Sequence, residues 1–290
     1  KGGVAAMVGA LDALKAAGLR PAAPLVVQSV IEEECTGHGT LACLQRGYSG
    51  DAAVIPEPFA QTVMAGQVGV LWMRLNVTGR AAHVLDAKGG TSAVEAAMAL
   101  YRALGSLETA WLAPEARHPL WADHPNPVNL NLGRIEGGEW PASVPDACTA
   151  DLRIGFFPDT GPQEALAAVR RRITEALAEE PVLGGVSAWV EPRGQMAAGF
   201  ALDADEPLLA AMAEAHQGAT GRPAERLAAT ATTDARLFVG RGIPATCYGP
   251  RAENIHGADE RVDLDSVAEV TGALALVIAR WCGVESDPGG

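Results

Sequence analysis

The sequence lacks the features that mark secreted or membrane proteins. Its 290 residues contain five cysteines, which are scattered and form no Cys-x-x-Cys pair. This pattern indicates neither a disulfide framework nor a thiolate zinc site. The longest uncharged apolar run, residues 270–279, is far shorter than the about 20 residues of a membrane span. The apolar start of the chain carries Asp12 and Lys15, unlike a secretion signal. These absences predict a cytoplasmic protein with no membrane partner.

Positive charge is also scarce. The chain has 22 Lys and Arg against 35 Asp and Glu, a net charge of −13. Such an acidic chain is a poor partner for nucleic acid or an anionic membrane surface. Hydrophobic residues make up 48% and charged residues 20%, enough apolar material to form a core and argue against disorder. The length favours two domains, or one large domain with an insertion.

The beginning of the chain has the pattern of an α/β fold. Residues 4–14 carry an apolar stripe at helical spacing. Residues 24–31 form a nearly continuous β-branched run, which predicts a strand buried on both faces, and a second strand is predicted at 52–55. Both predicted strands run into carboxylates, at Glu32–Glu34 and at Glu57. In open α/β sheets, ligands bind at the edge formed by the carboxyl ends of the strands.

A second domain is predicted over residues 67–195. Its predicted elements are strands near 70–77, 128–135, 147–157 and 186–190, a helix with a capping box of Ser92 and Glu95, and a helix starting at Pro162. The resulting order, β-α-β-β-α-β, is typical of a ferredoxin-like sandwich.

The α/β character returns after residue 195. The predicted elements are a helix from Pro207, strands near 226–232 and 245–248, and a helix over 264–281 capped by Asp263. Segments 1–66 and 196–290 are therefore expected to fold together around an inserted domain.

Three adjacent carboxylates, Glu32–Glu34, are the strongest local feature. In isolation such a run is more often a solvated loop. Here it follows an apolar run and precedes Gly37-His38-Gly39, and a cation would relieve the repulsion between its charges. Oxygen ligands suit Zn²⁺, Mg²⁺ or Mn²⁺. Adjacent carboxylates can also divide the work, one binding metal while its neighbour acts as a general base.

Other candidates are spread along the chain. Glu57 lies between Pro56 and Pro58, which would hold its carboxylate stiffly, although a surface turn is an equally good interpretation of Glu57 alone. His256 is a candidate ligand because it lies in a polar loop beside carboxylates. His83 ends the first strand of the inserted segment, an odd place for a ligand of the other domain. Structural roles are favoured for His118 and His124, which lie in a loop, and for His216, which lies on a helix.

Several short motifs follow one another in order. They are Lys1-Gly2-Gly3; Glu33-Glu34 with Gly37 and Gly39; Pro56-Glu57-Pro58; Gly79-Arg-Ala-Ala-His83 with Gly89-Gly90; Gly137-Gly138, Val144-Pro145-Asp146 and Asp151-Leu-Arg153; Thr233-Asp-Ala-Arg236, Tyr248-Gly-Pro250, and His256 with Asp259-Glu260. Together they resemble the dinuclear-zinc amidohydrolase and aminopeptidase family that includes acetylornithine deacetylase, succinyl-diaminopimelate desuccinylase, aminoacylase and the glutamate carboxypeptidases. The resemblance covers essentially the whole chain.

The resemblance implies a fold and a metal site. Segments 1–66 and 196–290 would form a zinc-peptidase-like catalytic domain with three α/β/α layers. Residues 67–195 would form an inserted α+β ferredoxin-like lid and dimerisation domain. Glu33 would be the general base and acid, Glu34 and His256 would hold one zinc ion, and Glu57 would hold the other.

The resemblance also implies roles in substrate binding. His83 would reach the active site of the partner subunit in a homodimer and help to stabilise the tetrahedral oxyanion. Arg236 and Arg153 would bind the carboxylate of a small-molecule substrate, for which a guanidinium fork is suited. A surface ion pair is the alternative for either arginine, and is equally favoured for Arg153.

Two departures from the family pattern limit these expectations. The family's bridging aspartate and its first histidine ligand lie before the motif lysine, which here is Lys1, so the N-terminal part is expected to be absent. The intact parent would bind two Zn²⁺, with Co²⁺ or Mn²⁺ as substitutes. This chain would carry only a partial site, because four-coordinate zinc needs more ligands. Ser143 also replaces an asparagine that contacts substrate in many members.

The predicted function is metal-dependent hydrolysis of a linear amide. Deacylation of an N-acyl amino acid or a related small amine is the leading hypothesis, and this chain is expected to be an incomplete fragment with little activity. A dipeptidase or aminopeptidase of the same family is an alternative. A homologue that binds amino-acid derivatives without turnover is another, although the presence of Glu33 argues against it.

Overall fold

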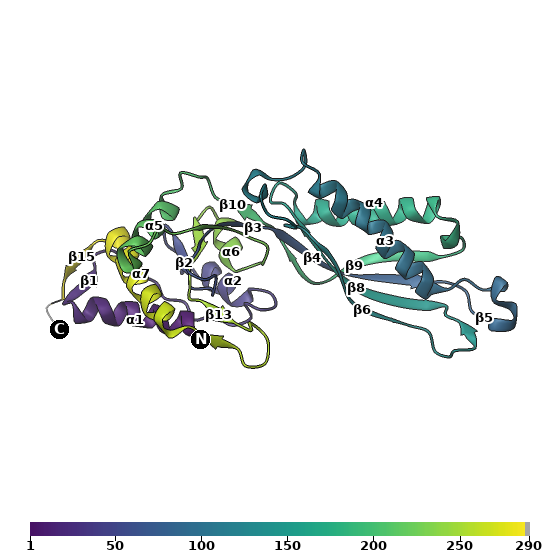
Figure 1. Ribbon diagram of the computed structural model, residues 1–290, viewed down its shortest axis with the longest axis horizontal. Helices are drawn as coiled ribbons and strands as arrows, with labels where there is room; N and C mark the ends of the chain where they lie inside the picture. The colour runs from purple at the N-terminus through teal and green to yellow at the C-terminus, as the bar shows by residue number, and fades with distance from the viewer. Residues whose placement is uncertain (288–290) are drawn as a thin grey trace. The chain divides into compact units, whose positions relative to one another are not determined.

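The structure, a computed structural model, describes residues 1–287 and divides the chain into two compact units (Figure 1). One unit contains residues 1–66, 201–229 and 233 onward, and the other contains residues 67–200 with 230–232. The predicted mixed α/β class is confirmed. In the described part of the chain no helix is both long and apolar enough to cross a membrane. All five cysteines are free thiols.

Three helices form the body of the first unit. Helix α7 (Leu264–Cys282) packs against both α1 (Gly2–Ala16) and α5 (Pro207–Thr220), and Figure 1 shows α1 in purple beside α7 in yellow. The Asp263 side chain accepts a hydrogen bond from the Ser266 amide, so the predicted cap of α7 is confirmed.

Short strands complete this unit. Strand β2 (Ala53–Ile55) pairs in parallel with β12 (Ala245–Cys247), and both lead directly into site segments. Strand β3 (Val63–Gln67) pairs with β11 (Arg226–Ala229). The smaller elements are α2 (His38–Gln45), α6 (Ala235–Val239), the pair β1 (Leu19–Pro21) and β15 (Val284–Ser286), and the pair β13 (Ala252–Glu253) and β14 (Arg261–Val262).

The prediction of a strand over residues 24–31 is wrong. These residues pair with no strand in the part of the chain that the structure describes, and Val26, Val27 and Ile31 are 44%, 44% and 75% exposed. The β-branched composition favours extended backbone locally, but a strand exists only through hydrogen bonds to a neighbour.

The second unit is built on a four-stranded antiparallel sheet with the strand order β6-β8-β4-β9. Its main elements in chain order are β4 (Gly69–Thr78), α3 (Ala93–Leu112), β6 (Leu130–Gly137), β8 (Ala147–Phe156), α4 (Pro162–Glu179) and β9 (Ser187–Ala197). Helices α3 and α4 pack on one face, where Leu71, Met73 and Leu75 of β4 are buried (Figure 1). Strand β9 continues past residue 195, where the sequence placed the end of the inserted domain, and the unit extends to Phe200.

The second unit also contains short strands and 3₁₀ helices. They are β5 (Ala82–His83), β7 (Ser143–Val144) and the short 3₁₀ helices η1 (Val84–Gly89), η2 (Pro119–Trp121) and η3 (Pro181–Leu183). Strand β10 (Phe200–Ala201) belongs instead to the sheet with the order β10-β3-β11. Strand β5 pairs with β7, so that His83 lies opposite Ser143.

Candidate active site

The acidic segment after residue 31 forms a tight turn instead of ending a strand. The Glu32 carbonyl accepts hydrogen bonds from the amides of Thr36 and Gly37, at 3.0 and 2.8 Å. The Glu32 carboxylate also accepts a hydrogen bond from the Thr36 hydroxyl, at 2.8 Å. Glu32 has a φ of 64°, a left-handed conformation that non-glycine residues seldom adopt. Glu32 thus closes the turn that presents Glu33 and Glu34.

Glu33, the second residue of this turn's acidic run, has a half-buried carboxyl group with a raised pKa. Its pKa is raised to about 7, chiefly by burial and in addition by the nearby carboxylates of Glu57, Asp234 and Glu34, while Arg236 lowers it. A carboxyl group with a pKa near neutrality can both accept and donate a proton at physiological pH.

Glu34 meets His256, which comes from the far end of the chain. Oε2 of Glu34 lies 3.6 Å from Nε2 of His256, and both side chains are largely exposed. His256 has a φ of 61°, and its amide donates a hydrogen bond of 2.9 Å to Glu260, which fixes the loop. One carboxylate and one imidazole therefore face each other at an accessible position.

Glu57 follows strand β2 directly, and two glycines allow close packing on its segment. A Cβ atom on Gly249 would lie 2.1 Å from the carbonyl oxygen of Glu57, and one on Gly3 would lie 2.0 Å from that of Pro56. Only glycine permits this approach. Burial raises the pKa of Glu57, and the charges of Glu34 and Asp234 raise it further. The structure thus brings Glu33, Glu34, Glu57 and His256 together.

Arg236 is engaged with the protein itself. Its Nη1 donates to the Thr233 carbonyl at 2.7 Å and its Nη2 to the Thr36 carbonyl at 3.0 Å. Its guanidinium also lies 3.4 Å from the Asp234 carboxylate. Arg236 therefore ties the acidic turn to the start of α6, and its binding of a substrate carboxylate stays a prediction.

Asp234 and Thr40 had no role assigned by the sequence motifs. The Asp234 carboxylate is buried and accepts a hydrogen bond of 2.6 Å from the Thr40 hydroxyl on α2. A Cβ atom on Gly37 would lie only 2.3 Å from Oδ1 of Asp234, and Gly37 has a φ of 73°. The available signal was the place of Asp234 in the motif Thr233-Asp-Ala-Arg236, which leads into α6.

His83 and Arg153 belong to the second unit. The His83 Nδ1 accepts a hydrogen bond from the Leu85 amide at 3.2 Å, and its ring meets Trp140 edge-on. Arg153, on β8, donates hydrogen bonds to the Asn129 side chain and the Thr230 carbonyl. Burial lowers the pKa of Arg153. The roles of both residues in a reaction stay predictions.

The donors of the site fit a zinc-type cation in their chemistry. Carboxylate and imidazole are common zinc ligands, and the repulsion among Glu33, Glu34 and Glu57 is what a cation would relieve. Within residues 1–287, however, no three His, Cys, Asp or Glu side chains converge into a ready ligand group. The described residues therefore supply suitable ligands but not a complete set.

Comparison with known families settles the class of the protein. A family model described as Peptidase family M20/M25/M40 matches residues 1–280. The chain belongs to this family. The resemblance inferred from the motifs is thereby confirmed, and the chain is an M20 hydrolase of amide or peptide bonds.

Individual M20 relatives act on different amides. N-formyl-4-amino-5-aminomethyl-2-methylpyrimidine deformylase of Halalkalibacterium halodurans is 27% identical, over 97% of this chain and 70% of the relative. Acetylornithine deacetylase of Vibrio atlanticus is 24% identical, over 89% of this chain and 65% of the relative. The fold is similar to that of a tripeptidase from Staphylococcus aureus, with a TM-score of 0.73, 19% identity and coverage of 96% of this chain and 70% of the tripeptidase.

Proposed function

We propose that this M20 protein catalyses the metal-dependent hydrolysis of a linear amide and removes the acyl group from an N-acyl amino acid or a related small amine. The observation that carries this proposal is Glu33, a half-buried carboxyl group with a pKa of about 7 beside Glu34 and Glu57. A base of this kind has a use in hydrolysis and none in simple binding.

In the proposed chemistry, Glu33 accepts a proton from the attacking water and later donates it to the leaving amine nitrogen. Two bound zinc ions, or Co²⁺ or Mn²⁺ as substitutes, would supply Lewis-acid activation of the water and the amide carbonyl. Glu34 and His256 would hold one ion, which their 3.6 Å separation supports, and Glu57 would hold the other. The amide bond breaks as the amine nitrogen takes up the proton.

The ligand set proposed here is partial. Three protein ligands are named for two ions, whereas a catalytic zinc ion ordinarily has three of its own. The family pattern places a bridging aspartate and a histidine before the motif lysine. With so few ligands, we expect residues 1–290 to bind metal weakly and to turn over slowly.

We propose that the first unit is the catalytic domain, of the three-layer zinc-peptidase type, and that the second is an inserted lid and dimerisation domain. The β4-α3-β6-β8-α4-β9 order of the second unit supports the ferredoxin-like part of this proposal. In the homodimer, His83 would stabilise the oxyanion in the partner's site. The free cysteines support a reducing, cytoplasmic location.

The substrate is proposed to be a small molecule with a carboxylate, bound by Arg236 and Arg153. A neutral N-formyl amine is a second candidate, because both guanidinium groups already donate hydrogen bonds to protein oxygens. The deformylase relative, named for a formylated aminomethylpyrimidine, supports the second candidate. Comparing KM for an N-acyl amino acid with KM for its neutral amide in Arg236→Gln and Arg153→Gln distinguishes the two. If an arginine binds the substrate carboxylate, its replacement should raise KM for the acid and leave KM for the neutral amide unchanged.

A dipeptidase or aminopeptidase of the same family remains an alternative, supported by the fold of the tripeptidase. A panel of N-formyl, N-acetyl and N-succinyl amines and of dipeptides, with saturating zinc and high protein concentration, tests the proposal. We expect slow release of the free amine from an N-acyl substrate and its loss in Glu33→Gln. Cleavage of dipeptides alone would favour the alternative. Binding of N-acyl amino acids without hydrolysis would favour a non-catalytic homologue.

A further inference from the structure

The segment that follows Glu57 contains an unusual turn. Ala60 and Gln61 are consecutive non-glycine residues with φ values of 53° and 65°. This left-handed conformation brings the Cβ atom close to the backbone and is disfavoured for both residues. Such a turn persists only where surrounding groups hold it.

The Gln61 side chain provides that hold. It is only 4% exposed, and both ends of its amide are bonded. Its Nε2 donates to Oε2 of Glu269 on α7 at 2.7 Å, and its Oε1 accepts from the Arg251 guanidinium. The Gln61 backbone amide donates to the Gly249 carbonyl at 2.8 Å.

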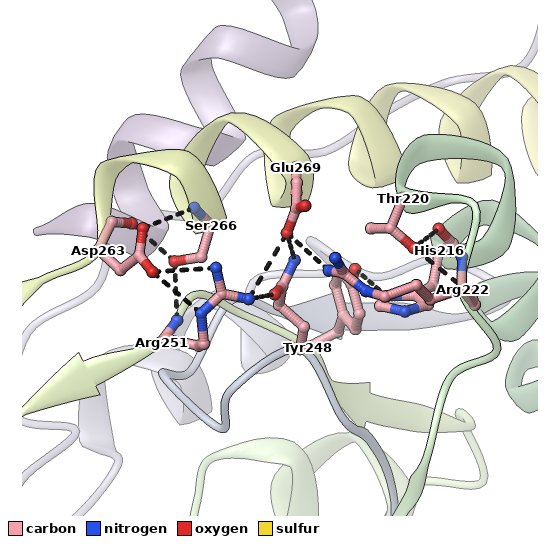
Figure 2. Close-up of polar contacts among 9 residues, drawn as sticks. His216, Thr220, Arg222, Tyr248, Arg251, Asp263, Ser266 and Glu269 are labelled. Atoms are coloured by element: carbon pink, nitrogen blue, oxygen red, sulfur yellow. Dashed lines mark hydrogen bonds and ion pairs between the residues drawn. The ribbon is translucent and has the colours of Figure 1, made fainter.

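The partners of Gln61 are themselves fixed. Figure 2 shows Glu269 projecting from α7 between Arg251 and Arg222. Arg251 is also bound to Asp263, the N-cap of α7, through two guanidinium nitrogens at 2.9 and 3.0 Å (Figure 2). Gln61 is therefore anchored to the first half of a long helix, not to a mobile loop.

The turn is tied closely to Glu57. The Phe59 amide donates to the Glu57 carbonyl at 2.8 Å, and the Thr62 amide donates to the Phe59 carbonyl at 3.1 Å. Gly249, whose carbonyl accepts from Gln61, also packs against the Glu57 carbonyl oxygen. A displacement of Gln61 would therefore move the Glu57 backbone.

We propose that Gln61 is a positioning residue for Glu57. Through Glu269 and Arg251, it holds the left-handed turn and thereby fixes the place of the Glu57 carboxylate among the acidic groups of the site. This inference rests on the proposed role of Glu57 as a metal ligand.

A backbone role and a side-chain role of Gln61 can be separated. Glycine tolerates a positive φ but lacks the side-chain amide of glutamine. Gln61→Gly therefore relieves the backbone strain and removes the hydrogen bonds to Glu269 and Arg251. Gln61→Ala removes the same hydrogen bonds but keeps the backbone strain of a non-glycine residue at positive φ. If the side chain positions the segment, both variants are impaired, whereas if the turn needs only a permissive backbone, Gln61→Gly behaves like the wild type.

The experiment combines amide hydrogen exchange of the metal-free chain with calorimetric titration of Co²⁺ alone. We expect Gln61→Gly and Gln61→Ala to exchange faster at residues 57–62 and to bind Co²⁺ about tenfold more weakly, the loss typical of an outer partner of a ligand. Thr220→Val is the matched control, because the Thr220 hydroxyl bonds backbone atoms of His216 and Arg222 at the other end of the network (Figure 2). Glu269→Ala replaces the Gln61 variants if these do not fold.

Wild-type exchange and Co²⁺ affinity in Gln61→Gly would overturn the proposal. Faster exchange with unchanged Co²⁺ affinity would also overturn it, since the turn would then be held without consequence for Glu57. If the wild-type chain binds no Co²⁺, the proposed metal site fails, while faster exchange in the variants still supports the hold of Gln61 on the Glu57 segment.

Discussion

His256 and Glu34 lie 3.6 Å apart, imidazole Nε2 to carboxylate Oε2, although they come from opposite ends of the chain. Two separate loops are needed to bring them together. The Glu34 turn is closed by Glu32, and the His256 loop is fixed by Glu260. The pair is therefore a product of the tertiary fold of the first unit, and its proposed metal-binding role can be tested one residue at a time.

A side chain at position 37 is expected to destabilise the first unit. Gly37→Ala combines a φ of 73° with a Cβ position 2.3 Å from Asp234 Oδ1. Gly47→Ala is the control, because Gly47 has a φ of 86° and no atom within 4 Å of the Cβ position. We expect Gly47→Ala to cost about 1 kcal/mol of unfolding free energy through backbone strain, and Gly37→Ala to cost about 1–3 kcal/mol more through the clash. Denaturant unfolding measures both, and equal losses would show that Asp234 moves aside freely.

The bond between Thr40 and Asp234 should stabilise the first unit. Thr40→Val leaves a buried carboxylate without its hydroxyl donor at nearly constant volume, and we expect it to lower the unfolding free energy by about 1–3 kcal/mol. Thr40→Ser keeps the hydroxyl and should recover most of the loss. Equal destabilisation by Val and Ser in thermal unfolding would mean that the methyl packing of Thr40 matters more than its hydrogen bond.

The ion pair between Asp151 and Arg74 should make the second unit sensitive to acid. Two hydrogen bonds, of 2.6 and 2.7 Å, lower the pKa of Asp151 below its ordinary value. A lowered pKa in the folded state adds stability at pH values above the unfolded pKa, about 3.9, and this stability is lost as the pH falls through the folded pKa. Asp151→Asn should therefore lower Tm at pH 7, and the difference from wild type should shrink below about pH 4.

The matched control for this ion pair is Asp159→Asn, which changes an exposed carboxylate of the same unit. We expect its Tm to follow the wild type at every pH. A Tm difference between Asp151→Asn and wild type that stays constant from pH 7 to pH 3 would assign the effect of Asp151 to packing and not to its charge.

Elements set by local signals could be predicted from the sequence. Helix α7 begins at its predicted cap, Asp263, because a cap and an apolar stripe act within a few turns. The strand expected over residues 24–31 is absent, because strand pairing depends on distant residues that a local composition does not reveal.

The candidate site could also be predicted only in part from the sequence. The order of the motifs led to Glu33, Glu34, Glu57 and His256, which the fold places together. The hydrogen bond from Arg236 to the Thr36 carbonyl could not be predicted, since it joins segments 200 residues apart.

The most direct test of the metal site is a zinc titration, followed by calorimetry, of the wild type, Glu34→Gln, His256→Ala and the control His124→Ala. We predict weak zinc binding by the wild type and by His124→Ala, and a loss of affinity of more than about tenfold in the other two, because direct ligands contribute more than their outer partners. Equal zinc affinity in all four proteins would contradict the proposed pairing of Glu34 and His256.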